Sequence, residues 1–247
     1  MSLNKLSNFT TSGVTAKTVR VRPRDAASLL IVDRSGKDWR VLMGKRHMRH
    51  VFMPGKFVFP GGRVEPSDGK VPAFAELSDH DQRKLLGGMG ARGTLARCRA
   101  VALAAIRETY EEAGLIMGRR SDAGRWPAFD DWTAFAERGI APDLSALRYF
   151  ARATTPPGGS RRFDTRFFLA FAESIADRLP AITGPAQELE ELAWPTFDEA
   201  TALDIPNITR MIIGEARALL QDNPELAPGN ALVQYGMKHG RFVREVI

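Results

Sequence analysis

Residues 104–115 read AAIRETYEEAGL, and this stretch decides how the rest of the chain is interpreted. It overlaps the end of the segment 94–113, which contains neither proline nor glycine and is predicted to form one long helix. Thr94 is a suitable N-cap residue, and Gly114 suits the position after the last turn, where the backbone is commonly left-handed. The helix therefore ends in a cluster of three glutamates and one arginine.

The long helix separates into two sides when its residues are placed 100° apart. One broad apolar side holds Leu95, Ala102, Ile106, Tyr110 and Ala113, and the other side holds Val101, Ala105, Glu108 and Glu112. We therefore expect the glutamates to point away from the contact with the core.

The charge pattern of the helix indicates a cation site. Glu108 and Glu112 are four residues apart, a spacing at which like charges destabilise a helix by about 0.2–0.5 kcal/mol. Arg107 and Glu111 form a second pair at this spacing, and a charge-assisted hydrogen bond between them fixes Glu111. Because converging carboxylate oxygens are what Mg²⁺ or Mn²⁺ requires, the pattern favours a divalent metal site. A solvated acidic helix face with one salt bridge is the alternative.

The segment 54–68, PGKFVFPGGRVEPSD, precedes this helix and supplies a short strand, a Gly-Gly turn and an acidic residue. Glycine has no Cβ, so a backbone carbonyl near Gly61 could approach a metal closely. We include Gly61 among the candidate metal ligands.

The composition is that of a globular protein, with 44% hydrophobic and 26% charged residues over 247 positions. We expect a single domain, 1–247, with a flexible start at 1–12. Predicted strands are 26–33, 39–43, 57–59, 147–153 and 165–172, and predicted helices are 79–86, 94–113, 131–138 and 207–221. The unequal spacing of these elements favours an α+β sandwich over a doubly wound sheet.

Several classes of protein are disfavoured by the sequence. The one cysteine, Cys98, excludes an internal disulfide and a multi-cysteine zinc site. The chain shows neither a long apolar run nor the order of a signal peptide, so we expect a cytoplasmic protein without a membrane partner. No helix-turn-helix, zinc-finger or RNP-type motif is present, and no nucleic-acid partner is expected.

The formal net charge of +6 suggests an anionic partner. Residues 39–63 contain six Lys or Arg and no acid, although a solvated basic face explains this equally simply. Guanidinium groups bind phosphate in a forked geometry. Candidate substrate-binding residues are Arg46, Arg49, Arg161, Arg162 and Arg166. In the run RRFDTRFF, 161–168, the phenylalanines either contact a ligand or belong to the core of a strand.

Gly62, Asp68 and the run 107–115, RETYEEAGL, together resemble the Nudix box, G-x5-E-x7-R-E-U-x-E-E-x-G-U, where U is a bulky aliphatic residue. Three departures stand out. Asp68 replaces the first Glu, Thr109 replaces the first U, and 38 residues instead of seven separate Asp68 from Arg107. The resemblance covers roughly residues 26–200 and is strongest in the box.

The resemblance implies the Nudix α/β/α sandwich with a mixed β-sheet and a helical insertion, about 69–93, inside the box. It also implies metal-dependent hydrolysis of a nucleoside diphosphate derivative, with Mg²⁺ or Mn²⁺ as cofactor and a small-molecule nucleotide as substrate. Glu108 and Glu112 would be the main metal ligands, Glu111 would add a ligand or a water-mediated contact, and Arg107 would orient the glutamates. Members of the family take the general base from different places. Glu188 is our first choice, and a glutamate of the box is the alternative.

The long insertion and the FMPGKFVFPGGRVEPSD and RRFDTRFF segments are similar to the branch of the family that cleaves coenzyme A and acyl-coenzyme A. This similarity implies 3′,5′-ADP and a 4′-phosphopantetheine derivative as products. The alternatives are an ADP-ribose or nucleotide-sugar pyrophosphatase, and a non-catalytic Nudix module that binds a nucleotide. The insertion could form a lid, a wall of the site or a homodimer contact.

Overall fold

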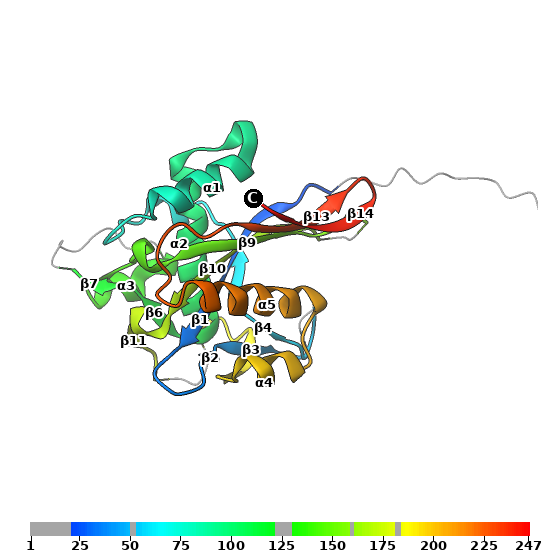
Figure 1. Cartoon of the computed structure of the whole chain (residues 1–247). Helices are drawn as coiled ribbons and strands as arrows, with labels where there is room; N and C mark the ends of the chain where they lie inside the picture. Colours follow the sequence, from blue (N-terminus) through cyan, green and yellow to red (C-terminus); the bar gives the residue numbers. More distant parts are fainter. Residues whose placement is uncertain (1–20, 50–52, 122–129, 159–160, 181–183) are drawn as a thin grey trace, which may run out of the picture.

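The computed structural model describes residues 21–49, 53–121, 130–158, 161–180 and 184–247 (Figure 1). The flexible start expected at 1–12 lies outside these ranges. Within them, no helix combines the length and the apolar composition that crossing a bilayer requires.

In the part of the chain that the structure describes, five strands precede the first α-helix, and strands and helices are mixed after it. The strands are β1 (Arg24–Asp33), β2 (Arg40–Val41), β3 (Met43–Arg46), β4 (Phe57–Val58), β5 (Gly61–Arg63), β6 (Leu115–Met117), β7 (Arg119–Arg120), β8 (Ile140–Ala141), β9 (Arg148–Thr154), β10 (Phe163–Phe171), β11 (Ile175–Arg178), β12 (Leu189–Ala193), β13 (Val233–Lys238) and β14 (Arg241–Val246). The α-helices are α1 (Asp79–Met89), α2 (Leu95–Ala113), α3 (Thr133–Glu137), α4 (Phe197–Ala202) and α5 (Asn207–Asp222). Short 3₁₀ turns include η1 (Asp68–Lys70) and η3 (Asp130–Trp132).

The large sheet is mixed, as expected. Its order is β14-β13-β9-β10-β1-β2. The strand β5 also pairs with β1, near the start of β1, whereas β2 pairs with the end of β1. The central pair β1–β10 is parallel, whereas β9–β10 and β1–β5 are antiparallel. A second, smaller sheet is antiparallel and has the order β12-β3-β4.

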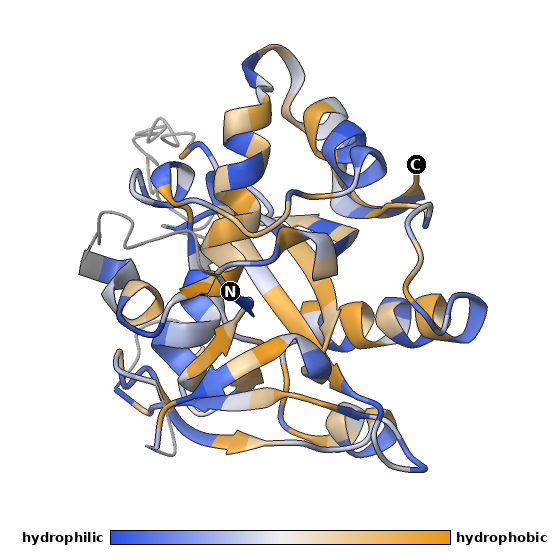
Figure 2. Ribbon diagram, turned by 90° about the vertical axis from the view of Figure 1, so that its left-hand side faces the viewer, coloured by the Kyte–Doolittle hydropathy of each residue, from blue (hydrophilic) through white to orange (hydrophobic). Residues whose placement is uncertain are grey.

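Two hydrophobic clusters cover the two faces of the large sheet. On one face, residues of β1 such as Leu29 and Ile31 pack with α2, and on the other face Leu30 and Val32 pack with α5. The helices α2 and α5 therefore lie on opposite sides of the sheet, as Figure 1 shows. In Figure 2 the strands at the centre of the molecule are largely hydrophobic. The α/β/α sandwich predicted from the sequence is confirmed.

The caps of α2 are those that the sequence predicts. The side chain of Thr94 accepts a hydrogen bond from the backbone N–H of Arg97, and Gly114 adopts a left-handed backbone with φ of 67°. The predicted division of the helix into two sides is wrong. Leu95, expected in the core, is 59% exposed, whereas Val101 and Ala105 on the other side are fully buried. Every residue from Val101 to Arg107 is buried, because β1, β5, β6 and η1 all contact the helix.

The Gly-Gly pair was also misread as a turn. Gly61 and Gly62 lie in β5 and pair with Ser28 and Ala27 of β1. A Cβ on Gly61 would lie 2.6 Å from the carbonyl oxygen of Ala27, so only glycine permits this approach of the two strands. Gly61 and Gly62, called the glycine strip below, therefore form a stretch of the sheet without side chains.

The insertion carries the predicted helix α1, with Ser78 as its N-cap. Its Asp81 is fully buried and accepts a hydrogen bond from the backbone N–H of Tyr149 on β9 at 3.2 Å. Lys84 pairs with Asp81 at 2.8 Å and donates to the backbone carbonyls of Tyr149 and Asn230. Because Asn230 precedes β13, α1 fastens β9 to the C-terminal segment.

We predict that Asp81→Asn leaves the buried ammonium of Lys84 without a charged partner and destabilises the protein by about 3–5 kcal/mol in urea denaturation. Amide hydrogens of β13 should exchange faster in this variant. Asp79→Asn changes an exposed residue in the first turn of the same helix and should cost less than about 1 kcal/mol. Equal stability and unchanged exchange in the Asp81 variant would show that α1 does not hold this edge.

Candidate active site

Arg107 organises the candidate site from the middle of α2. Its guanidinium pairs with both carboxylate oxygens of Asp68, at 2.8 and 3.2 Å, and donates to the carbonyl oxygen of Arg63 at 2.8 Å. It also contacts Glu108 at 3.0 Å and Glu111 at 2.8 Å. Arg107 is 3% exposed, so these contacts replace the water that its N–H groups would otherwise bind.

Asp68 has a structural role, since it binds Arg107 from the position that a Glu occupies in the Nudix box. It is fully buried in η1, and its Oδ2 also accepts a hydrogen bond from the backbone N–H of Glu65 at 2.8 Å. The shorter Asp side chain at the box position of Glu reaches Arg107 because η1 packs directly against α2. The 38-residue separation in sequence is therefore bridged by this pair.

Thr109 occupies the other substituted position of the box and is fully buried. Its hydroxyl donates to the carbonyl oxygen of Ala105, one turn earlier, at 2.8 Å. This local hydrogen bond satisfies the hydroxyl, so the helix accepts Thr where an aliphatic residue is usual.

Glu108 and Glu112 face β5, which corrects the expectation that they point away from the packed side of the helix. Glu112 is 2% exposed and accepts a hydrogen bond from the backbone N–H of Gly61 at 2.9 Å. A Cβ on Gly62 would collide with the carboxylate of Glu108, so glycine at this position makes room for that side chain. The two glutamates thus lie against β5 at the place where it pairs with Ala27 and Ser28 of β1.

Burial raises the pKa of both glutamates. The pKa of Glu108 rises to about 7, although the charge of Arg107 opposes the rise. Burial, and next the charge of Glu108, raise the pKa of Glu112 well above its usual range. Burial also raises the pKa of Glu111, again against the effect of Arg107. Burial alone would lower the pKa of Arg107, but its bond with Asp68 and the charges of Glu108 and Glu111 raise it overall.

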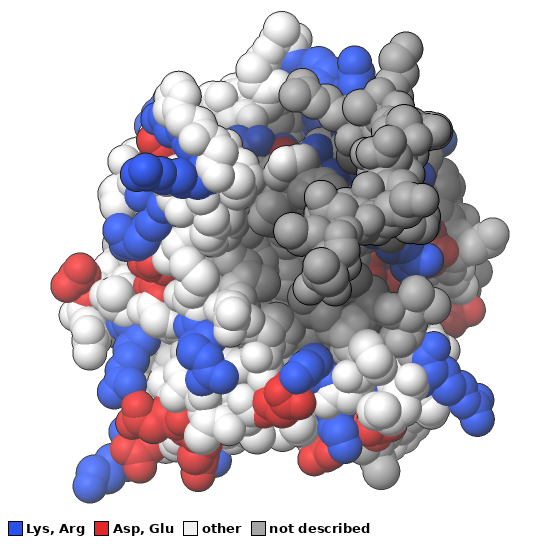
Figure 3. Space-filling view, turned by 90° about the vertical axis from the view of Figure 1, so that its right-hand side faces the viewer, with Lys and Arg blue, Asp and Glu red and all other residues white. Residues whose placement is uncertain are grey.

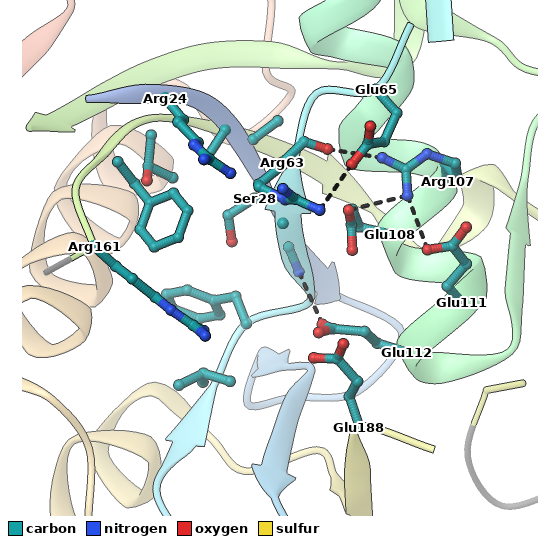
Figure 4. A pocket seen from close by; sticks show the side chains of 18 of the residues that line it. Arg24, Ser28, Arg63, Glu65, Arg107, Glu108, Glu111, Glu112, Arg161 and Glu188 are labelled. Carbon is teal, nitrogen blue, oxygen red and sulfur yellow. Dashed lines mark hydrogen bonds and ion pairs between the residues drawn. The ribbon is translucent and has the colours of Figure 1, made fainter. Parts of the chain in front are cut away.

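These carboxylates line a cavity of about 1210 Å³ (Figure 4). Glu108, Glu111 and Glu112 stand on one side, and Glu188 of the loop before β12 lies close to Glu112 in the same view. Arg24 and Arg161 project from the opposite side, and Arg63 lies between the two groups. The cavity therefore has an acidic end and a basic end.

The donor set at the acidic end fits a divalent cation, since it brings together the buried carboxylate of Glu112 and the partly buried carboxylates of Glu108 and Glu111. Among the described residues, no three His, Cys, Asp or Glu side chains stand in a metal-binding arrangement. The bonds already described explain this, because Glu108 and Glu111 turn toward Arg107 while Glu112 turns toward Gly61. Gly61 contacts the carboxylate of Glu112 through its backbone N–H. The ligand role expected for its carbonyl oxygen stays a prediction.

Arg46 and Glu188 lie together at the cavity because β3 pairs with β12. Arg46 Nη2 is 3.2 Å from Glu188 Oε2. Arg46 was expected to bind substrate, and the structure also gives it the task of holding Glu188.

The remaining predicted arginines differ in position. Arg161 reaches the cavity, and Arg162 lines it but donates to the carbonyl oxygens of Thr155 at 3.1 Å and Val21 at 2.8 Å. Arg49 is exposed and is not among the residues that line the cavity.

The expectation for Arg166 is corrected. It is 2% exposed and pairs with Asp25 at 2.6 Å and Asp164 at 3.2 Å. Side chains alternate between the two faces of β10, so Arg166 faces away from the cavity, whereas Phe163 and Phe167 line it. Phe168 belongs to the core cluster on the α2 side. The phenylalanines of this segment thus serve both roles that the sequence left open.

The cavity residues that were missed in the sequence include Arg24, Arg63 and Glu65. Arg63 and Glu65 form an ion pair at 3.1 Å. Their place directly after the Gly-Gly pair was the available signal. Arg24 had none, because its position at the cavity follows from the pairing of β1 with β10.

The acid-free segment 39–63 is not a basic patch in the folded protein. Lys45 pairs with Glu190, Lys56 with Asp204 and Arg40 with Glu199. On the face shown in Figure 3, basic and acidic side chains likewise lie next to one another along the lower part. Much of the charge run is therefore neutralised by acidic partners from other segments, while Arg46 and Arg63 line the cavity.

We predict that Asp68→Asn, which removes one partner of a buried ion pair, destabilises the protein by about 3–5 kcal/mol in urea denaturation without added metal. Glu245→Gln removes the exposed ion pair with Lys238 and should cost less than about 1 kcal/mol. If both substitutions had the same small effect, Arg107 would not depend on Asp68.

Comparisons with known proteins agree with this architecture. No family model matches the chain. An acyl-coenzyme A diphosphatase NUDT19 from Gallus gallus is 30% identical over 66% of this chain and 55% of the relative. The Homo sapiens protein of the same name is 27% identical over 66% of this chain and 55% of the relative. The chain thus spans about half the length of the curated relatives it matches.

A solved structure supports the same grouping. The crystal structure of a Nudix hydrolase from Alicyclobacillus acidocaldarius is 27% identical and superimposes with a TM-score of 0.59. The match covers 84% of this chain and 98% of that structure. Together with the helix that carries Arg107, Glu108, Glu111 and Glu112, these similarities lead to one conclusion: the chain belongs to the Nudix hydrolase family.

Proposed function

We propose that this protein hydrolyses the diphosphate linkage of a nucleoside diphosphate derivative, and that the derivative is coenzyme A or an acyl-coenzyme A. The observation that carries the proposal is the cavity with a cluster of glutamates at one end and arginines at the other. The relatives named acyl-coenzyme A diphosphatase support the choice of substrate. The products would be 3′,5′-ADP and a 4′-phosphopantetheine derivative.

Glu108 and Glu112 are the residues that we assign to hold Mg²⁺ or Mn²⁺, with Glu111 as an additional ligand. When bound, such a cation neutralises the diphosphate and activates water for attack at phosphorus. Arg107 holds Glu108 and Glu111 in place from the buried side. Gly62 has no side chain and so leaves room for the carboxylate of Glu108 at the cavity wall.

Glu188 is the residue that we assign as general base. It lines the same cavity as Glu112, and Arg46 contacts its Oε2. The other carboxylate oxygen, Oε1, would accept the proton of the attacking water. Arg46 would thereby fix the orientation of the base.

The proposal is tested by product analysis after incubation with coenzyme A, acetyl-coenzyme A, ADP-ribose and a nucleotide sugar, with Mg²⁺ and with Mn²⁺. Release of 3′,5′-ADP from coenzyme A or its acetyl ester is the expected result. Release of AMP from ADP-ribose alone would support diphosphate hydrolysis but contradict coenzyme A as the substrate. Absence of cleavage in the whole panel would favour a module that only binds nucleotides.

We predict that Glu112→Gln lowers kcat by several orders of magnitude while the protein stays folded by circular dichroism. The amide keeps the hydrogen-bonding oxygen for Gly61 but removes the charge that a cation requires. Unchanged turnover of this variant would contradict the assigned metal site.

The base is tested by a matched pair of substitutions on neighbouring residues. Glu188→Gln should lower kcat about 10²–10⁴-fold, the usual contribution of general-base catalysis. Glu190→Gln removes a carboxylate that pairs with Lys45 and is not among the cavity-lining residues, so kcat should hardly change. Equal effects of the two substitutions would move the base to a glutamate of α2.

A further inference from the structure

Arg24 and Arg161 lie at one end of the cavity because of the strand arrangement. Arg24 is the first residue of β1, and Arg161 lies two residues before β10. The two strands are parallel, with Arg24 paired to Phe163, and the backbone N–H of Arg24 donates to the carbonyl oxygen of Arg162 at 2.9 Å. Both side chains therefore start from the same end of the central strand pair.

These two guanidinium groups differ from the other arginines of the cavity. Arg63 pairs with Glu65, Arg46 contacts Glu188, and Arg107 contacts Asp68. Within the described residues, neither Arg24 nor Arg161 has a side-chain hydrogen bond or an ion pair. Both project into the cavity from the side opposite the glutamates, as Figure 4 shows. Two cations that face a cavity without a carboxylate between them form a site for an anion.

The basic end is separated from the acidic end by part of β1. Ser28, which pairs with Gly61 beside Glu112, lies four residues after Arg24. At about 3.3 Å per residue, the two backbone positions are roughly 13 Å apart. The two phosphoryl groups of a diphosphate share one bridging oxygen, so a diphosphate held at the glutamates does not extend along this stretch. An anion at the arginines would therefore be a separate group of the substrate.

The wall between the two ends suits a nucleoside. Phe163, Thr165 and Phe167 occupy alternate positions of β10 and all line the cavity. Aromatic rings provide surfaces for a base or a ribose, and a hydroxyl provides a hydrogen-bonding group.

We propose that Arg24 and Arg161 bind a phosphomonoester carried by the nucleoside of the substrate, apart from the diphosphate that is cleaved. This inference rests on the proposed function, and in coenzyme A the group is the 3′-phosphate. Forked guanidinium groups bind the terminal oxygens of such a phosphate and select substrates that carry it over substrates that lack it.

The test compares coenzyme A with 3′-dephospho-coenzyme A as substrates of the wild-type chain and of Arg24→Ala/Arg161→Ala. The wild type should prefer coenzyme A. The double variant should lose about 10- to 100-fold in kcat/KM for coenzyme A, mostly through KM, and little for the dephospho compound. The control Arg120→Ala/Arg241→Ala removes the same charge from exposed residues outside the cavity lining and should leave both values unchanged.

Other outcomes would overturn the inference without touching the proposed hydrolysis. Equal losses on both substrates would assign the arginines to the diphosphate, and equal rates of the wild type on both substrates would mean that the extra phosphate is not recognised.

Binding separates this inference from the proposed activity. Calorimetry with 3′,5′-ADP and AMP, on protein without metal, requires no turnover. Tighter binding of 3′,5′-ADP that is lost in the double variant supports the phosphomonoester site even if coenzyme A is not cleaved. Equal binding of the two nucleotides contradicts it even if coenzyme A is cleaved.

Discussion

The buried contact between Arg107 and Asp68 is the interaction on which the site depends. A guanidinium can be removed from water only if its N–H groups find acceptors, and Asp68, Arg63, Glu108 and Glu111 supply them. These acceptors come from η1, from β5 and from α2 itself. One side chain thereby fixes the helix against the strand that carries Gly61 and the turn that begins the insertion. The distance between the glutamates and the glycine strip follows from this contact.

The same contact explains how the chain accommodates a long insertion within its functional motif. The chain leaves the site after η1 and returns at Thr94, where α2 begins. Between these points, Asp81 and Lys84 attach α1 to β9 and to the segment before β13. The insertion thus packs on the edge of the sheet next to the C-terminal strands. Its removal would expose backbone groups of β9 that Asp81 and Lys84 now satisfy.

Local signals in the sequence were sufficient for α2, its two caps and the cluster of glutamates. They were insufficient for orientation, because a helical wheel assumes one buried side, and α2 contacts neighbours on several sides. Likewise, the alternation of β10 showed that Arg166 and Phe167 face opposite ways but not which of them faces the cavity. Pairing at long range decided this, as it did for Arg24 and for Gly61. The sequence matched Asp68 to the first Glu of the box, and only the fold shows that its carboxylate pairs with Arg107.

The central claim is that carboxylates of α2 hold a divalent cation in front of the glycine strip. Its most direct test is a titration of Mn²⁺ followed by electron paramagnetic resonance, which reports free Mn²⁺ without any substrate. The account predicts saturable binding by the wild type and by Glu190→Gln, and an affinity at least about tenfold lower for Glu112→Gln. The same binding curve for all three proteins would contradict it.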